Sequence, residues 1–207
     1  MVKSWKVEKQ VSYSDVVLSG DLSYSNHLLS GEVHVHRKIY QKLLHPLISS
    51  SKHVSWALIF SRKDNFGPGK GIWISGEQVR VEQMIGGLKV FDIEQVVFAS
   101  ADELEDYDHM QRLKKEFHLH RDRVHTCRSV EEMFGLISLA PEVITDRYHP
   151  GVVSLIQGIK LTITKYQKEE IKLTGLIKMT NYTKAEVEDM NDKAFISLLN
   201  IIQGRRR

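Results

Sequence analysis

The sequence predicts an α/β protein built on a Rossmann-like, doubly wound and mostly parallel sheet, with a C-terminal helix extension. Three observations support this fold class. From about residue 50 onward, short apolar segments alternate with longer amphipathic ones. The alternation repeats five times, which is the pattern of parallel strands joined by crossover helices. Hydrophobic residues make up 42% of the 207 residues, which is enough to form a substantial buried core.

The strands are predicted from short runs of β-branched and other apolar residues that end in polar turns. Five runs have this composition: Val54–Phe60, Gln95–Ser100, Arg123–Cys127, Glu142–Thr145 and Lys160–Thr164. A glycine-rich turn, Asp64–Gly71, follows the first run. The spacing of apolar residues then predicts a helix over Ser75–Leu88, and another from Asp102 or Glu103 to about Phe117.

Start signals predict the helices in the second half of the chain. Ser129-Val130-Glu131-Glu132 is a capping box, with serine at the cap and glutamate three residues later. Pro150 is the expected first residue of a helix that runs to about Gly158, because the first helical residue needs no N–H donor. Further helices are predicted over Tyr166–Ile177 and from a second capping box at Thr183 to about Gln203.

The chain is predicted to consist of an arm, residues 1–50, and a Rossmann-like domain, residues 51–207. Signals in the arm are mixed: Val16–Leu18 has the composition of a strand, and Glu32–Ile48 combines strand and helix signals. The regular alternation begins only after this segment. We therefore expect one domain preceded by a less regular N-terminal segment.

Composition and charge disfavour several classes of protein. Twenty-nine basic residues against 26 acidic ones give a net charge of only +3, so bulk electrostatics does not favour a nucleic-acid-binding protein. The single cysteine, Cys127, allows no internal disulfide, which fits a reducing compartment. No apolar run approaches the roughly 20 residues of a membrane helix, and the start of the sequence as given lacks the apolar stretch of a signal peptide. These features favour a cytoplasmic location but do not fix the compartment.

Cationic residues follow several of the predicted strands directly. Arg62, Arg147 and Lys165 come just after strands, and His149 follows two residues after Arg147. The carboxyl ends of parallel strands meet at one edge of a sheet, where ligands bind. The helix expected at Pro150 would add backbone N–H groups and the positive end of its dipole. These features predict a site for a small, multiply charged anion; the alternative is that they are ordinary surface charges of loops.

No metal site is predicted from the histidines. The pairs His34-x-His36 and His118-x-His120 lack a third ligand at a spacing typical of zinc sites. The chemistry expected of this chain therefore depends on charged side chains.

Residues Asp146-Arg147-Tyr148-His149 give the sequence a specific resemblance. This block resembles the Asp-Arg-x-His motif of the polysaccharide pyruvyl transferase family. The resemblance covers roughly residues 54–200. Other features follow in the order found in the family: the strand end Phe60-Ser61-Arg62, a strand followed by Asp102, a helix opened by Ser129, then the motif, Gly158 and Lys165-Tyr166.

The resemblance implies a fold of two Rossmann-like halves, similar to that of GT-B glycosyltransferases, with the donor held mainly by the C-terminal half. It implies a transferase of polysaccharide biosynthesis that uses phosphoenolpyruvate to place a pyruvate ketal on a sugar of a polysaccharide or other glycan. Phosphoenolpyruvate is the donor substrate in this reaction, and no cofactor is expected. Carried over by position, Arg62, Arg147, Tyr148 and His149 match the donor-binding residues.

The roles of these residues follow from the charges of the implied donor. Arg62 and Arg147 can each hold its phosphate or its carboxylate through bidentate contacts, which a lysine cannot reproduce. His149 is the candidate catalytic residue, although a histidine can either bind phosphate as a cation or move a proton, and we favour binding. Asp146 is expected to orient Arg147 through an ion pair, and Lys165 to support the site.

One departure from the family concerns the N-terminal half, which would need well over one hundred residues, whereas about fifty precede the first predicted strand. We expect residues 1–50 to be the end of such a half. We also expect the isolated chain to transfer little, and an N-terminal half supplied in trans to complete the cleft. Two alternatives stay open: half of a GT-B-type nucleotide-sugar glycosyltransferase, and a non-catalytic binding domain left by truncation.

Overall fold

The computed structural model describes residues 32–50, 56–100, 103–166 and 171–180, and also residues 185, 186, 189, 192, 193 and 196. The predicted strand Val16–Leu18, the residue Asp102 and the capping box at Thr183 lie outside the described residues. The helices are α3 (Glu32–Leu43), α4 (His45–Ser50), α5 (Glu103–Glu116), α6 (Val130–Ile137), α7 (Tyr148–Ile156) and α8 (Ile171–Met179). The strands are β1 (Ala57–Phe60), β2 (Ile72–Ser75), β3 (Gln78–Glu82), β4 (Leu88–Asp92), β5 (Val96–Ser100), β6 (Val124–Thr126), β7 (Glu142–Thr145) and β8 (Lys160–Ile163).

The large sheet has five parallel strands in the order β6-β5-β1-β7-β8, which confirms the predicted fold class. All five strands lie within the five apolar runs that predicted them. The chain adds strands on one side of β1 first, through β5 and β6, and then on the other side, through β7 and β8. The order therefore reverses between β1 and β7, and this switch point is where open α/β sheets bind ligands.

The predicted helix over Ser75–Leu88 is wrong, because this segment contains β3, the middle strand of a small antiparallel sheet with the order β2-β3-β4, together with the last residue of β2 and the first of β4. In β3, Val79 and Val81 are fully buried while the residues between and beside them point outward, which is a period of two and not the helical period. Gly76 has a φ of +58° at the turn between β2 and β3, a conformation that disfavours a continuous helix. The link from β1 to β5 is thus this small sheet and not a helix.

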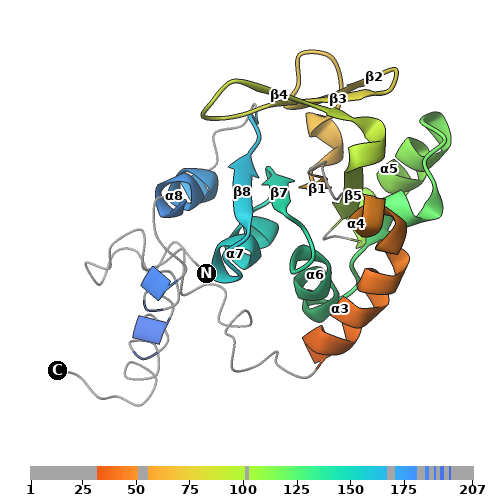
Figure 1. Cartoon of the computed structure of the whole chain (residues 1–207). Helices are drawn as coiled ribbons and strands as arrows, with labels where there is room; N and C mark the ends of the chain where they lie inside the picture. The colour runs from red at the N-terminus through yellow and green to blue at the C-terminus, as the bar shows by residue number, and fades with distance from the viewer. Residues whose placement is uncertain are drawn as a thin grey trace.

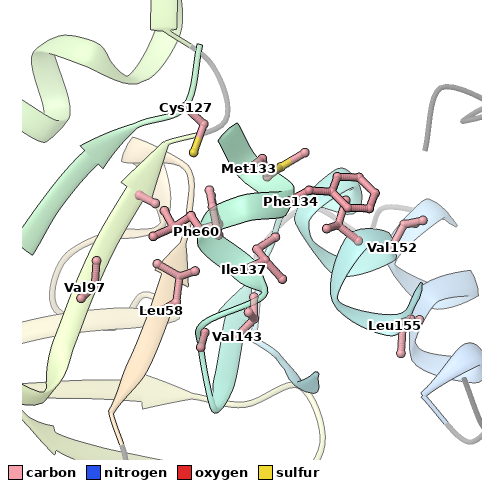
Figure 2. Packing of buried hydrophobic residues seen from close by; sticks show 14 of the residues in the cluster. Leu58, Phe60, Val97, Cys127, Met133, Phe134, Ile137, Val143, Val152 and Leu155 are labelled. Atoms are coloured by element: carbon pink, nitrogen blue, oxygen red, sulfur yellow. The ribbon is translucent and has the colours of Figure 1, made fainter. Parts of the chain in front are cut away.

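Two cores lie on opposite faces of the large sheet. On β1, Leu58 and Phe60 belong to a core shared with α3, α6, α7 and α8, whereas Ala57 and Ile59 belong to one shared with the small sheet and α5. Figure 1 shows the small sheet as a layer above the parallel strands, with α6 and α7 below. Figure 2 shows the lower core, where Ile137 of α6 lies near Leu58 and Val143.

The mixed signals over residues 32–48 resolve into helices that pack onto this core. Tyr40, Leu44 and Leu47 are buried there. The helices α3 and α6 approach closely at Gly135, where a Cβ atom would come within 2.8 Å of the backbone nitrogen of Arg37. Only glycine permits that distance without a shift of α3. The division of the chain at residue 50 stays a prediction.

The helix starts agree with their predicted signals within a few residues. Ser129 caps α6 by accepting a hydrogen bond from the backbone N–H of Glu132 (3.2 Å). The helix α7 begins at Tyr148, so Pro150 is its third residue and not its first. The helix predicted from Tyr166 begins at Ile171, after residues 167–170, which are not described. Within the described residues, no helix is long and apolar enough to cross a membrane.

Candidate functional site

Arg62 and Arg147 lie side by side at the carboxyl edge of the large sheet. Phe60 at the end of β1 is in register with Thr145 at the end of β7, and each arginine follows two residues later. These two strands flank the switch point of the sheet. The structure therefore brings together the two arginines that the sequence placed on one edge.

Asp146 joins the two strand ends. Its side chain is fully buried, and its Oδ2 accepts hydrogen bonds from the hydroxyl of Ser61 and the amide of Asn65, both at 2.7 Å. Its Oδ1 accepts one from the backbone N–H of Arg62 at 3.1 Å. Burial raises the pKa of the Asp146 carboxyl, against these hydrogen bonds and the charge of Arg147, which lower it. Asp146 is thus a structural link between the loops that carry the arginines.

Asn65 extends this link to a third loop. Its amide also donates to the hydroxyl of Thr164, at 3.1 Å, and its Oδ1 accepts the backbone N–H of Gly71 at 3.0 Å. A Cβ atom at Gly71 would lie 2.1 Å from the carbonyl oxygen of Lys165, so the glycine is needed for this approach. The sequence predicted this segment only as a glycine-rich turn, and nothing in its composition singled out Asn65.

Arg147 pairs with Asp106 of α5, a partner that the sequence did not predict, and the expected ion pair between Asp146 and Arg147 stays a prediction. The Asp106 side chain is almost fully buried, and it also accepts a hydrogen bond from the hydroxyl of Ser100 at 3.2 Å. The backbone of Arg147 is fixed as well, because its N–H donates to the hydroxyl of Thr145 at 2.8 Å. Sequence reasoning missed Asp106, since it belongs to a helix more than 40 residues away.

Arg62 and Lys165 occupy the rim of this edge. The guanidinium of Arg62 lies 4.7 Å from the ring centre of Tyr166, whose hydroxyl donates to Asp64 at 3.0 Å. Lys165 pairs with Glu82 of the small sheet at 2.8 Å, and its side chain is 60% exposed. The cation of Lys165 therefore lies at the surface, between the large and the small sheet.

Tyr148 and His149 are the first two residues of α7. The Tyr148 ring is buried in the core, so only its backbone can contact a ligand at this edge, whereas His149 is exposed. The two rings meet edge to face, with 5.7 Å between their centres. The first turn of α7 directs its N–H groups and the positive end of its dipole toward the same edge, next to Arg147.

His109 is a buried histidine that sequence reasoning did not identify. Its Nδ1 lies 3.2 Å from the guanidinium of Arg112, and its ring packs on Phe66 with 4.6 Å between centres. Burial, together with the charges of Arg112 and Lys63, lowers its pKa to about 4. Since arginine is always a donor, Nδ1 accepts and the proton of the neutral ring is on Nε2, which bonds to none of the described residues.

The edge as a whole presents cations from three loops over a buried carboxylate framework. The cations are Arg62, Arg147 and Lys165. The imidazole of His149 lies beside them at the start of α7, and Asp106 and Asp146 lie beneath. Such an arrangement can hold a small anion with more than one charge. Among the residues that the structure describes, no group of three or more His, Cys, Asp or Glu side chains could hold a metal ion.

Comparison with protein families gives a match for part of the chain. No curated protein and no solved structure matches the chain. Residues 73–167 match the family model described as polysaccharide pyruvyl transferase. The matched residues contain most of the small sheet, β5 to β8, and three of the edge residues, Arg147, His149 and Lys165, whereas Arg62 precedes the match. Residues 73–167 of this chain are therefore similar to the polysaccharide pyruvyl transferase family.

Proposed function

We propose that the chain binds phosphoenolpyruvate at the carboxyl edge of the large sheet and transfers its pyruvyl group, as a ketal, to a sugar of a polysaccharide or other glycan. The observation that carries this proposal is the position of Arg62 and Arg147, which follow the two strands at the switch point. Phosphoenolpyruvate carries a phosphate and a carboxylate close together. Two guanidinium groups on neighbouring loops, each able to form paired hydrogen bonds, match those two anionic groups.

The reaction needs a proton for the donor carbon and a stabilised leaving phosphate. Protonation of the methylene carbon makes a cation at the adjacent carbon, and a sugar hydroxyl attacks it. Loss of phosphate and attack by a second hydroxyl of the same sugar complete the ketal. The two sugar hydroxyls lose two protons. One makes up for the proton that converts the methylene group into a methyl group, and the other leaves with the phosphate. The proposed donor supplies the activated group itself, so the reaction requires no cofactor.

Some of the neighbouring residues are proposed to bind the donor, and others to hold the binding residues in place. His149, exposed at the start of α7, is proposed to contact the donor phosphate, and the backbone of Tyr148 to donate to the same group. Lys165 is proposed to add charge from the rim, where Glu82 positions it. Asp146 is proposed to support the site by fixing the loops and not as an acid.

Calorimetric titration with phosphoenolpyruvate tests the donor site. Arg147→Lys keeps the charge but loses the planar fork, so binding should weaken by about 1–3 kcal/mol, roughly 5- to 150-fold. Arg121→Lys is a matched control, because Arg121 is exposed and precedes β6 at the opposite edge. Equal affinities for wild type and Arg147→Lys would remove Arg147 from the site.

Two measurements on His149→Ala distinguish phosphate binding by His149 from proton transfer by it. If the imidazole binds phosphate, the affinity for phosphoenolpyruvate should fall. If it only moves a proton, the affinity should stay nearly constant while transfer to the acceptor stops. Stabilisation by nucleotide sugars, but not by phosphoenolpyruvate, would instead favour a nucleotide-sugar glycosyltransferase.

A further inference from the structure

The outer face of the small sheet carries an unusual combination of side chains. Its inner face is apolar and packs on the large sheet through residues such as Val79 and Val81. Its outer face carries Trp73 on β2, Arg80 on β3 and Val90 on β4, which are directly opposite one another in the strand register. Trp73 is 37% exposed and Val90 is 50% exposed. Figure 1 shows this sheet at the outside of the molecule.

Trp73 and Arg80 form an ordered pair on this face. The guanidinium of Arg80 lies 5.5 Å from the ring centre of Trp73. Within the described part of the chain no carboxylate pairs with Arg80, so the indole holds the guanidinium in place and its N–H groups are not used by an ion pair there. Among the described residues, β2 is an edge of the small sheet, and no further strand of that sheet lies beyond Trp73.

The outer face leads directly to the proposed donor site. Glu82 lies two residues after Arg80 on the same face of β3, roughly 7 Å along the strand. Its carboxylate pairs with Lys165 at 2.8 Å, and its carbonyl oxygen accepts the backbone N–H of Lys165 at 2.7 Å. The next residue, Tyr166, lies against Arg62 at the donor edge. A ligand on this face can therefore extend to the donor without crossing another element of the small sheet.

We propose that the outer face, defined by Trp73, Arg80 and Glu82, binds the saccharide acceptor. One sugar ring stacks on the indole, and its hydroxyls bond to the guanidinium and the carboxylate. A sugar has an apolar face of C–H groups and a polar edge of hydroxyls, and an aromatic ring beside a few placed polar groups matches both. This inference rests on the proposed transferase function and assigns its acceptor to this face.

The polar middle strand favours a saccharide over a protein or a lipid surface. Gln78, Arg80 and Glu82 point outward along β3 and separate Trp73 from Val90. This polar row divides Trp73 from the exposed apolar side chains Leu88 and Val90 of β4, so charged and amide groups border the indole, whereas the centre of a protein interface is continuously apolar and poor in charge.

Calorimetry with a panel of neutral tetrasaccharides built from glucose, galactose or mannose tests this assignment. We expect one or more to bind, Trp73→Ala to weaken that binding at least tenfold, and Trp73→Phe to retain part of it. Tyr107→Ala is a matched control, because Tyr107 is an aromatic residue of α5 that is 46% exposed and lies away from the outer face of the small sheet. Arg80→Gln gives a second test if Trp73→Ala lowers the unfolding midpoint.

The outcomes separate this inference from the donor site. Unchanged phosphoenolpyruvate affinity in Trp73→Ala, together with lost saccharide binding, supports the acceptor assignment. If the wild type binds a saccharide but does not bind phosphoenolpyruvate, the proposed function is contradicted, whereas the saccharide site on the outer face is retained. The assignment is overturned if no tetrasaccharide binds, if Trp73→Ala and Arg80→Gln bind as well as wild type, or if Trp73→Ala abolishes self-association or vesicle binding instead.

Discussion

Asp146→Asn tests whether one buried carboxylate fixes the two arginine loops. The substitution keeps the shape but replaces one acceptor oxygen by an N–H donor. At the Oδ2 position that donor would face the Ser61 hydroxyl and the Asn65 amide, each 2.7 Å from the present oxygen. The Ser61 hydroxyl can turn, but Asn65 cannot exchange its amide atoms, because its Oδ1 accepts the N–H of Gly71. In the reversed orientation the new donor would instead face the backbone N–H of Arg62, 3.1 Å from the present Oδ1, so at least one buried donor is left without an acceptor in either case.

The cost of such a donor is about 1–3 kcal/mol. With a urea dependence of roughly 2 kcal/mol per molar, a loss of 2 kcal/mol lowers the urea midpoint by about 1 M. The assay is urea unfolding followed by circular dichroism. Asp108→Asn is the matched control on an exposed carboxylate of α5, and its change should stay within about 0.5 kcal/mol. If both variants unfold at the wild-type midpoint, the hydrogen bonds of Asp146 do not hold the loops.

Two further predictions concern buried titratable groups. His109 has a pKa of about 4 against its usual 6.5, so folding stability should be complete above pH 6.5 and fall by about 3 kcal/mol as the pH drops to 4. His109→Phe should lack this loss in urea titrations, and an identical acid dependence would contradict it. Burial beneath α3 raises the pKa of Cys127 to about 12, so the thiol should react with a disulfide reagent at pH 8 only when the chain unfolds. Rapid labelling of the native protein would mean that α3 opens away from α6.

The large sheet and its edge could be predicted from the sequence because local signals and tertiary structure agree there. The strands β1, β5 and β7 are buried on both faces, so they read as short continuous apolar runs. Once the runs are identified as parallel strands, the residues after them must meet at one edge. This is why Arg62 and Arg147 could be placed together before their surroundings were known.

The small sheet could not be predicted in the same way, because its apolar residues fit two periods. Val79, Val81, Met84, Ile85 and Leu88 follow helical spacing, but only Val79 and Val81 are buried, whereas Met84, Ile85 and Leu88 are exposed. The first two alternate as in a strand, and the others lie in or beside the loop between β3 and β4. A pattern of apolar residues cannot reveal which of them face solvent, and Gly76 was the local signal that favoured a turn.

The partners of the two arginines could not be predicted from the local sequence either. These partners, Asp106 for Arg147 and Tyr166 for Arg62, affect how the edge would hold an anion. A guanidinium has five N–H donors in a fixed plane, so pairing with Asp106 is compatible with binding a ligand oxygen. The buried carboxylate fixes the plane of the Arg147 guanidinium before the ligand arrives, which lowers the ordering cost of binding, while Tyr166 does the same for Arg62 by stacking. The Asp106 carboxylate also offsets part of the charge of Arg147. This limits the repulsion between Arg147 and Arg62, which follow the neighbouring strands β7 and β1. Because both guanidinium groups have fixed orientations, this edge is selective for a ligand whose two anionic groups match them. The pairing of Arg147 with Asp106 costs such a ligand little affinity.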